Sequence, residues 1–428
     1  MTSSLKFKTT KLAVIGLGYV GLPLAIEFGK KRNVIGFDID KVRINELKNL
    51  QDTSLQISRD EFRQSVNLNF TNNIDDIKDC KIFIVTIPTP IDKKKKPDLR
   101  LLKKGCIMLS PFIKKGSLVI FESTVYPGVT EEICAPIIEK HSKLIFNKDF
   151  FCGYSPERIN PGDKVHDIKN ILKLTSGSTP EIATKVDELY KEIIIAGTFK
   201  TSSIKIAEAA KVIENTQRDV NIALVNELSI IFNKLNIDTK SVLDAAGTKW
   251  NFFPFKPGLV GGHCIGVDPY YLAHKSLEVG HNPEMILSGR KINDKMPFYV
   301  AKQLKKLMIK NNIDYSNANI LIMGFTFKEN FPDIRNSKIS DLVNGIRKYN
   351  SNIDVFDPWP KKEVVKKEYN INLIKKPIKR KYDVILFAVA HDAFKKLSIK
   401  QIRTLGKKKH VIYDLKNVLN SEEADLKL

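Results

Sequence analysis

The chain has 428 residues, of which 43% are hydrophobic and 28% charged, proportions typical of a globular protein with two or three domains. Its five cysteines show no paired short spacing, which argues against a disulfide framework or a zinc site, so we expect a reducing, cytoplasmic compartment and no bound metal. The formal net charge is +22, but aromatic residues do not interleave with the lysine clusters, so we expect no nucleic-acid binding. No apolar run reaches the ~18 residues of a membrane-spanning helix, so we expect no membrane insertion.

The first 200 residues alternate short apolar runs with amphipathic stretches. This alternation predicts a parallel sheet wound by helices. The strands are expected at Leu12–Ile15, Val34–Phe37, Ile82–Thr86, Leu118–Phe121 and Ile171–Leu174.

The turn after the first of these strands has the pattern Gly-x-Gly-x-x-Gly. Gly16, Gly18 and Gly21 follow a strand and open a helix, whose exposed N–H groups can bind a pyrophosphate. Asp38 ends the next strand, 22 residues after Gly16, where a carboxylate accepts hydrogen bonds from a ribose and repels a 2′-phosphate. The pattern therefore predicts NAD rather than NADP, and a nucleotide-free domain with structural glycines is the alternative. Further cofactor contacts are expected from Tyr19, Val20 and Arg43.

Two turns rich in hydroxyl groups follow other predicted strands. Thr86 and Thr89 lie in one, and Thr124 lies in the other. Ligands of open α/β sheets bind at this carboxyl edge, although such turns are also ordinary loop chemistry. Because the two turns share one edge, we assign all three threonines to the cofactor site.

The segment Ile204–Leu235 contains neither Gly nor Pro and predicts one helix, long enough to cross between domains and to pack against a partner. Glu208, Lys211, Asn215 and Arg218 fall on one face of it. A solvated stripe of charges is the default interpretation of such a face. Asparagine is a poor helix former, however, and a lysine and an asparagine one turn apart can both donate to a developing oxyanion.

The remaining elements predict an α/β protein with two doubly wound, Rossmann-like domains joined by the long helix and a helical middle domain. The expected domains are 1–200, 201–310 and 311–428. The turn Gly324–Lys328 lacks the three-glycine pattern, so no second dinucleotide is expected. Helices are expected at Ser241–Ala246, Pro269–Val279 and Lys295–Lys310, and strands at Ile320–Gly324, Ile353–Phe356, Val384–Ala388 and Val411–Tyr413.

A glycine-padded loop, residues 261–268, sets Cys264 beside Asp268. A thiol there can become a nucleophile if its pKa is lowered, whereas a dyad with His263 is disfavoured because neighbouring loop residues usually diverge. Asp268 could activate water, orient Lys211 or cap the helix predicted at Pro269. With a dinucleotide site in the same chain, the thiol suggests oxidation of a substrate to an aldehyde, trapping on sulfur, a second oxidation and hydrolysis.

These residues together resemble the nucleotide-sugar 6-dehydrogenases of the UDP-glucose/GDP-mannose dehydrogenase family over nearly the whole chain. The motif from Pro257 to Tyr271 is similar to the branch that acts on UDP-N-acetylglucosamine or UDP-N-acetylgalactosamine. UDP-glucose enzymes typically carry a lysine where this chain has Val267, which argues against UDP-glucose. The resemblance implies an NAD domain, a helical middle that forms a homodimer or larger oligomer, a UDP-binding domain, and a product for surface polysaccharide such as capsule or O-antigen.

The resemblance also implies roles for individual residues. Cys264 would be the nucleophile, Lys211 with Asn215 would stabilise the oxyanion or exchange protons, Asp268 would help activate water, and Thr124 would lie near the nicotinamide. Arg335 would reach back to the cofactor. The weakest transfers are Lys249–Asn251 and Arg290. The substrate would be held by Glu157, which is also a catalytic candidate, and by Arg158, Ile159, Lys211, Asn215, Arg218, Gly261, Phe327, Lys328 and Lys416.

Three other functions remain open from the sequence. They are a UDP-glucose 6-dehydrogenase, a two-electron dehydrogenase or epimerase, and a nucleic-acid or regulatory binder without enzymatic activity. A two-electron dehydrogenase or epimerase would release one NADH or none for each sugar, whereas the four-electron reaction releases two. A UDP-glucose 6-dehydrogenase is distinguished by comparing kcat/KM for the two substrates.

Overall fold

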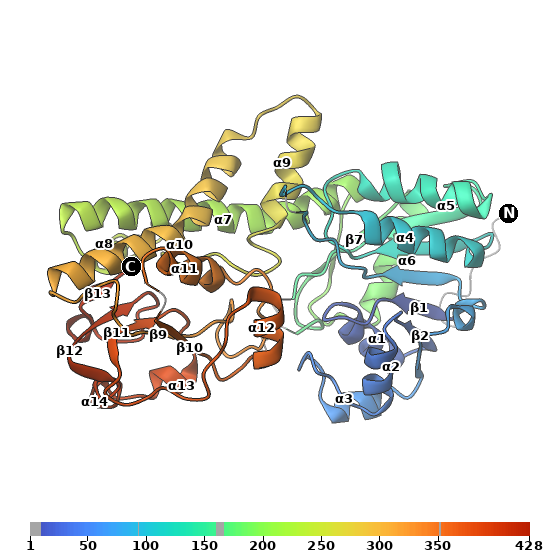
Figure 1. Ribbon diagram of the computed structural model, residues 1–428. Helices are drawn as coiled ribbons and strands as arrows, with labels where there is room; N and C mark the ends of the chain where they lie inside the picture. The colour runs from blue at the N-terminus through green and yellow to red at the C-terminus, as the bar shows by residue number, and fades with distance from the viewer. Residues whose placement is uncertain (1–9, 93, 160–166, 351) are drawn as a thin grey trace. The chain divides into compact units, whose positions relative to one another are not determined.

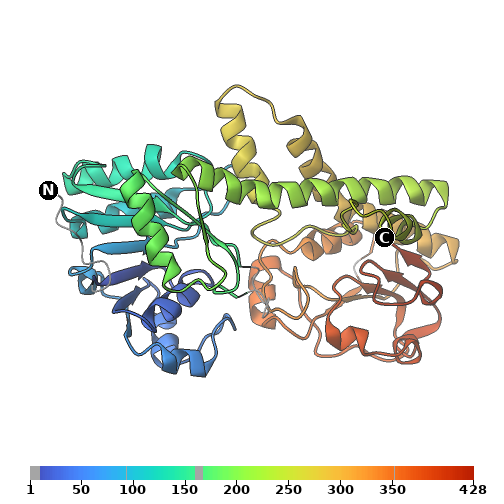
Figure 2. The same cartoon turned by 180° about the vertical axis from the view of Figure 1, so that it is seen from behind.

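The structure, a computed structural model, describes residues 10–92, 94–159, 167–350 and 352–428. The chain divides into two compact units, the first comprising Met1–Glu214 and Tyr270–His281 and the second Asn215–Pro269 and Asn282–Leu428. Helix α7 (Ile204–Leu235) has the predicted bounds, begins in the first unit and ends in the second. Figure 2 shows it as one uninterrupted helix.

The first unit is built on an eight-stranded sheet in the order β3-β2-β1-β4-β5-β6-β7-β8. Its strands β1, β2 and β7 are labelled in Figure 1. The expectation of a wholly parallel sheet is wrong at one place, because β6 and β7 pair antiparallel. The expected strand at 171–174 begins two residues later than predicted, and three further strands were not expected. The bounds are β1 (Leu12–Ile15), β2 (Val34–Phe37), β3 (Leu68–Thr71), β4 (Ile82–Val85), β5 (Ser117–Phe121), β6 (Phe150–Tyr154), β7 (Lys173–Gly177) and β8 (Thr198–Lys200).

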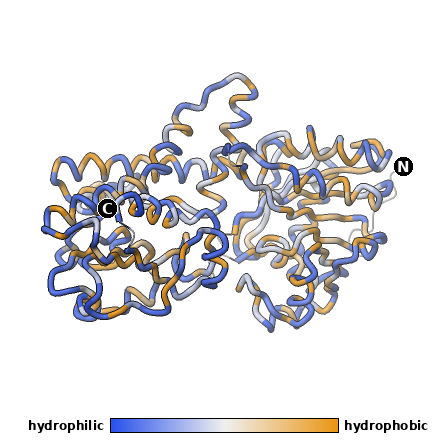
Figure 3. The backbone as a smooth tube through the Cα atoms, in the orientation of Figure 1, coloured by the Kyte–Doolittle hydropathy of each residue, from blue (hydrophilic) through white to orange (hydrophobic). Residues whose placement is uncertain are grey.

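The central strands of this sheet are short and apolar, and helices cover them. Every residue of β1 and β4 is buried, the pattern of parallel strands that are covered on both faces. Figure 3 shows hydrophobic colouring in the part of the first unit where Figure 1 labels β1. The covering helices are α1 (Gly21–Gly29), α2 (Lys41–Lys48), α3 (Arg59–Gln64), α4 (Arg100–Leu109), α5 (Ala135–Ser142) and α6 (Pro180–Lys191), and most of α9 (Asp268–Glu278) also belongs to this unit.

The second unit holds a five-stranded, wholly parallel sheet in the order β10-β9-β11-β12-β13. This confirms the predicted second doubly wound fold. The strands are β9 (Ile320–Met323), β10 (Ile353–Phe356), β11 (Tyr382–Phe387), β12 (Gly406–Asp414) and β13 (Leu426–Lys427), and the helices are α8 (Thr239–Ala246), α10 (Glu284–Lys310), α11 (Lys338–Arg347), α12 (Lys362–Tyr369), α13 (Asp392–Lys395) and α14 (Ile399–Arg403).

Helix α10 begins 11 residues before the predicted start at Lys295. Gly289 and Pro297 lie inside it, and both weaken a helical signal in sequence. A Cβ on Gly289 would lie 3.5 Å from that of Ala223 on α7, so the glycine lets the two helices approach closely. Tertiary packing thus extends the helix through residues that alone would not predict it.

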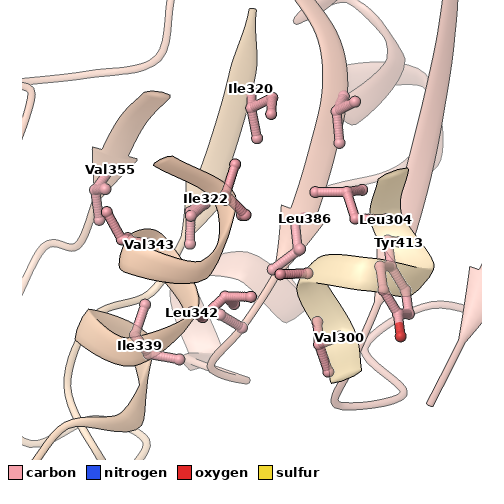
Figure 4. Close-up of a cluster of buried hydrophobic side chains, with 14 of the residues drawn as sticks. Val300, Leu304, Ile320, Ile322, Ile339, Leu342, Val343, Val355, Leu386 and Tyr413 are labelled. Atoms are coloured by element: carbon pink, nitrogen blue, oxygen red, sulfur yellow. The ribbon is translucent and has the colours of Figure 1, made fainter. Parts of the chain in front are cut away.

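The core of the second unit lies between its sheet and helices α10 and α11 (Figure 4). These side chains are all buried, and they come from elements that are far apart in the sequence. The labelled members are Val300 and Leu304 of α10, Ile339, Leu342 and Val343 of α11, and Ile320, Ile322, Val355, Leu386 and Tyr413 of the strands. Within the described ranges, no helix combines the length and the apolar character that crossing a membrane requires.

Candidate active site

The glycine-rich turn lies where the strand order of the first sheet reverses, between β1 and β4. Ligands of open α/β sheets bind at such a switch point. Gly16 has a φ of +94°, and a Cβ on Gly21 would approach the Gly16 carbonyl oxygen to 1.9 Å, so neither position accepts a side chain without distortion. A Cβ on Gly18 would meet no protein atom within 4 Å. Helix α1 has no side-chain cap, so the turn fits a pyrophosphate on exposed N–H groups.

Asp38 is tied to the same turn. Its Oδ2 accepts a hydrogen bond from the Leu17 N–H at 2.7 Å, and its Oδ1 accepts one from the Asp40 N–H at 2.9 Å. The Arg43 Nε donates to the Leu17 carbonyl oxygen at 3.0 Å, and its guanidinium pairs with Asp52 at 2.9 Å. The carboxylate therefore lies beside the turn, half-buried and with lone pairs left for a ribose. Arg43 stabilises the same turn through the Leu17 carbonyl oxygen.

The three predicted threonines have different surroundings. The Thr86 hydroxyl lies 2.7 Å from the Gly16 carbonyl oxygen and 3.0 Å from that of Ile15, so it links the ends of β1 and β4. The Thr89 hydroxyl donates to the Thr124 carbonyl oxygen at 2.6 Å and joins the two turns that sequence placed at one edge. Thr86 and Thr89 thus shape the site through the backbone, and Thr124 itself is half-buried.

A buried ionic cluster lies behind this edge. The Lys173 Nζ is 2.8 Å from the Glu122 Oε2 and 3.3 Å from the Glu157 Oε2, and the Tyr190 hydroxyl donates to the other oxygen of Glu122. Burial raises the pKa of Glu122 to about 7, although Lys173 pulls it down. The two carboxylates raise the pKa of Lys173 against the opposing effect of burial. The sequence analysis missed Lys173 and Tyr190, because nothing local marks a lysine in a strand as a partner of two distant glutamates.

Glu157 holds the segment that follows it. Its Oε1 accepts the backbone N–H groups of Arg158 at 2.6 Å and of Ile159 at 2.5 Å. The Arg158 guanidinium binds the Leu172 carbonyl oxygen at 2.7 Å and Glu214 at 2.8 Å. The three neighbouring residues that were predicted to line the site are therefore fixed together, with Lys173 on the other side of the glutamate.

The predicted face of α7 is not a solvated stripe. Glu208, Lys211 and Asn215 are buried, and only Arg218 is exposed. Glu208 accepts hydrogen bonds from the backbone N–H groups of Gly128, at 2.6 Å, and Thr130, at 2.9 Å. Burial raises the pKa of Glu208 to about 7, although these bonds act in the opposite direction. The default interpretation of this face is thus wrong, because a glutamate can be buried where it binds the start of another helix.

Two predicted catalytic residues meet in the second unit. The Asn215 side-chain amide donates to the Asp268 Oδ2 at 2.6 Å, and both residues are buried. Asp268 is the first residue of α9, and its own N–H and that of Val267 donate to the Cys264 carbonyl oxygen at 2.9 and 3.0 Å. Cys264 is half-buried in the turn that immediately precedes this helix. The structure therefore sets Cys264 and Asp268 on one short segment and binds the carboxylate of that segment to the Asn215 amide of α7.

The cysteine loop packs against the turn that follows β9. Cβ atoms on Gly261 and Gly262 would lie 3.1 and 2.9 Å from Phe327, so the glycines allow this close approach. The Asn336 side-chain amide donates to the Gly262 carbonyl oxygen at 3.1 Å. The ring of His263 meets Phe327 edge-on, with the centroids 6.2 Å apart.

A small, partly open pocket lies beside this contact, at the point where the strand order of the second sheet reverses between β9 and β11. It contains Gly261, Phe327 and Lys416 of the predicted substrate residues, together with Lys338, which the sequence analysis did not select. Lys416 pairs with Glu329 at 3.2 Å. The other lining residues are Leu259, Thr326, Ser337, Ile339, Ala388, Val389 and Leu415.

The remaining arginines that were predicted from the resemblance bind acidic neighbours. Arg335 makes a two-pronged contact with Asp333 at 2.5 to 3.0 Å. Arg290 is buried and pairs with Asp219 and Asp294, each at 2.6 Å. Residues 249–251 are exposed in the segment that follows α8. The ligand roles of these residues stay predictions.

Three family models match in order: the NAD binding domain over residues 10–194, the central domain over 205–295 and the UDP binding domain over 321–421 of the UDP-glucose/GDP-mannose dehydrogenases. A UDP-N-acetyl-D-glucosamine 6-dehydrogenase of Pseudomonas aeruginosa is 58% identical over 98% of this chain and 100% of its own length. The chain belongs to the UDP-glucose/GDP-mannose dehydrogenase family. The resemblance predicted from its motifs is confirmed, and so is NAD as its cofactor.

Other relatives of this dehydrogenase agree. A UDP-N-acetyl-D-glucosamine 6-dehydrogenase of Salmonella typhi is 57% identical over 98% of each chain, and Protein CapL of Staphylococcus aureus is 50% identical over 97% of each. Among solved structures, a UDP-D-ManNAc dehydrogenase of Pyrococcus horikoshii superposes with a TM-score of 0.89 at 28% identity, covering 98% of both chains. The protein is thus an NAD-dependent nucleotide-sugar dehydrogenase with the predicted fold.

Proposed function

We propose that this dehydrogenase oxidises the C6 hydroxymethyl group of UDP-N-acetyl-D-glucosamine to a carboxylate and reduces two NAD. The observation that carries the proposal is the packing of the cysteine loop on the wall of the nucleotide pocket through Gly261 and Phe327. A nucleotide in that pocket would bring its sugar near the thiol. The substrates named for the relatives at 57–58% identity, and Val267 in place of lysine, support the acetamido sugar over UDP-glucose.

The chemistry that NAD supplies when bound is the acceptance of hydride, once in each oxidation. Cys264 adds as thiolate to the C6 aldehyde and forms a thiohemiacetal, and after the second oxidation it is the leaving group of a thioester. Water then releases the acid and restores the thiol. The balance is one alcohol, two NAD⁺ and one water giving one carboxylate, two NADH and three protons.

Three side chains have roles in these steps. Lys211 donates to the oxygen that gains charge when the thiolate adds to the aldehyde, which stabilises that transition state. Asp268 accepts a proton from the hydrolytic water. The Asn215 amide, at 2.6 Å from Asp268, holds that carboxylate in one orientation.

The first test counts product. Purified protein is incubated with excess NAD and limiting UDP-N-acetyl-D-glucosamine, UDP-N-acetyl-D-galactosamine or UDP-glucose, and NADH is measured for each sugar consumed. We expect two NADH and the highest kcat/KM with the glucosamine compound. One NADH or none would refute the four-electron reaction, and a preference for UDP-glucose would refute the assigned sugar.

The second test removes the thiol. Cys264→Ser should stop at a slow or trapped intermediate, because a serine hydroxyl is a far weaker nucleophile than a thiolate. Cys80→Ser is the matched control, since burial raises the pKa of Cys80 to about 11 and keeps it a thiol. We expect the control to form two NADH. Full turnover by Cys264→Ser would contradict thioester chemistry.

We further propose that the enzyme is a homodimer in which α7 contacts a second copy of the chain. Leu224, Ile231 and Leu235 recur at helical spacing on α7 with 43–59% of their surface exposed, which is unusual for one face of a monomer. Leu224→Glu with Ile231→Glu should halve the mass in light scattering. An unchanged mass, or a monomeric wild type, would refute the interface. We place the enzyme in the cytoplasm, where NAD and nucleotide sugars occur, and the name of the CapL relative supports a role in capsule synthesis.

A further inference from the structure

We propose that His391 and Asp357 form a buried clamp that positions the nucleotide-binding turn of the second unit, residues 325–330. Neither residue was selected from the sequence, and neither lines the pocket. This inference rests on the proposed function, because it assigns a task to the turn that carries Phe327 and Lys328. The two residues are positioning residues and are not expected to touch the substrate.

The clamp holds the turn at both ends. The Asp357 Oδ2 accepts the backbone N–H groups of Phe325, at 2.6 Å, and Thr326, at 3.0 Å. Hydrogen bonds to a charged acceptor of this kind are stronger than neutral ones. At the other end, the Asn330 N–H donates to the His391 Nδ1 at 2.9 Å. The Asn330 side chain in turn accepts from the Asp392 N–H at 3.0 Å. The three residues between them, 327–329, therefore lie between two fixed points.

The protonation state of the imidazole follows from these bonds. Because Nδ1 accepts an N–H group, it carries no proton, and the proton of the neutral ring is on Nε2. Nε2 lies 3.0 Å from the Asp357 Oδ2, and the two side chains are fully buried. His391 thus joins both ends of the turn through one ring, with a donor on one side and an acceptor on the other.

The first unit has a carboxylate, Asp38, at the position equivalent to Asp357. Asp38 follows β2 as Asp357 follows β10, and each accepts an N–H of the turn after the preceding strand, Leu17 at 2.7 Å and Phe325 at 2.6 Å. Asp38 is half-buried, so it can also bind a ribose. In the second unit His391 covers the equivalent carboxylate completely. The same acid therefore serves the protein backbone there, through the N–H groups of Phe325 and Thr326.

The test measures binding of UDP and of NAD separately, by calorimetry on the full chain. His391→Leu removes both bonds, His391→Gln keeps a donor near Nε2, and His391→Asn keeps an acceptor near Nδ1. We expect the dissociation constant for UDP to rise at least about tenfold in the leucine variant and by a smaller factor in the other two, with NAD binding unchanged. The KM for the nucleotide sugar should rise in parallel while the KM for NAD stays constant.

A matched control is His410→Leu, because the His410 ring also binds a backbone carbonyl oxygen of the second unit, that of Lys407 at 2.8 Å, but does not approach the turn. UDP binding should be unaffected in it. Wild-type affinity for UDP in all three His391 variants would overturn the clamp alone. If the leucine variant does not fold, the glutamine and asparagine variants decide in the same way. A wild type that binds no UDP would overturn the proposed nucleotide pocket, and the clamp with it.

Discussion

The buried cluster around Lys173 allows a quantitative prediction. Lys173→Met keeps the length of the side chain but removes the only ammonium that the structure shows between Glu122 and Glu157, at 2.8 and 3.3 Å. The lysine side chain is 3% exposed and that of Glu122 is fully buried, so water does not replace the lost charge. Breaking such a buried pair costs about 3–5 kcal/mol, because a charge is left uncompensated.

The matched control is Lys191→Met. Lys191 pairs with Asp187 at 2.7 Å, closer than either distance in the cluster, but its side chain is 58% exposed. An exposed pair of this kind contributes at most about 1 kcal/mol. The two variants thus make the same chemical change in one unit, once at a buried lysine and once at an exposed one. At roughly 2–4 °C per kcal/mol for a unit of this size, Lys173→Met should lower the melting temperature by roughly 6–20 °C and the control by under about 4 °C.

The pH dependence separates this cause from a packing defect. Burial already raises the pKa of Glu122 to about 7 in the wild type, despite the pull of Lys173. Without the lysine the pKa rises further, so at pH 5.5 the carboxyl is protonated and the cost of the substitution falls. Urea unfolding at pH 8 and pH 5.5 measures this difference. Equal destabilisation by the two variants, or a loss in Lys173→Met that does not change with pH, would refute the electrostatic account.

Three further predictions follow from single contacts. Gly21→Ala should lower the melting temperature, because its Cβ would lie 1.9 Å from a backbone oxygen. Gly18→Ala should keep the wild-type melting temperature and weaken only the binding of NAD, which calorimetry can measure. Asn226 binds both the N–H and the carbonyl oxygen of Gly258, at 2.8 and 3.0 Å, in the segment that precedes the cysteine loop. Asn226→Ala should therefore cost about 1–3 kcal/mol in urea unfolding. It should also lower kcat, because the cysteine loop loses this support. The pKa of Glu208 is raised to about 7 from an ordinary 4.5, which stabilises the fold fully below pH 4.5 and no longer above pH 7. The free energy of unfolding should therefore fall between these two pH values, and Glu208→Gln should flatten this fall. An unchanged pH profile would contradict the prediction.

The sequence predicted features whose physical cause is local. The turn at Gly16–Gly21 needs glycines at fixed spacing for a backbone reason, and α7 has its predicted bounds because nothing within it interrupts a helix. The edge strands β3 and β8 escaped prediction because they are short and partly exposed, with little apolar pattern. The start of α10 escaped because Gly289 obscures a helix that packing against α7 stabilises.

The supporting residues of the site could not be predicted for a different reason. Lys173 lies 51 residues from Glu122 along the chain, and His391 lies 34 residues from Asp357. Asp357 and His391 both follow the carboxyl ends of parallel strands, whereas Lys173 begins β7, whose antiparallel direction brings its amino end to the edge where β5 ends, so no spacing in the sequence marks either pair. The candidate nucleophile Cys264, by contrast, is marked by the glycines on either side of it.

The acidic residues around both ligand sites share one physical task. A turn after a parallel strand has N–H groups with no partner in the sheet, and a carboxylate can accept two or more of them through strong, charge-assisted bonds. Each such bond fixes a backbone segment before any ligand arrives, which reduces the entropy lost on binding. In this chain of net charge +22, Lys338 and Lys416 line the pocket of the second unit and pair there with acidic neighbours. The residues that act in this way are Asp38, Glu157, Glu208, Asp357 and Asp414.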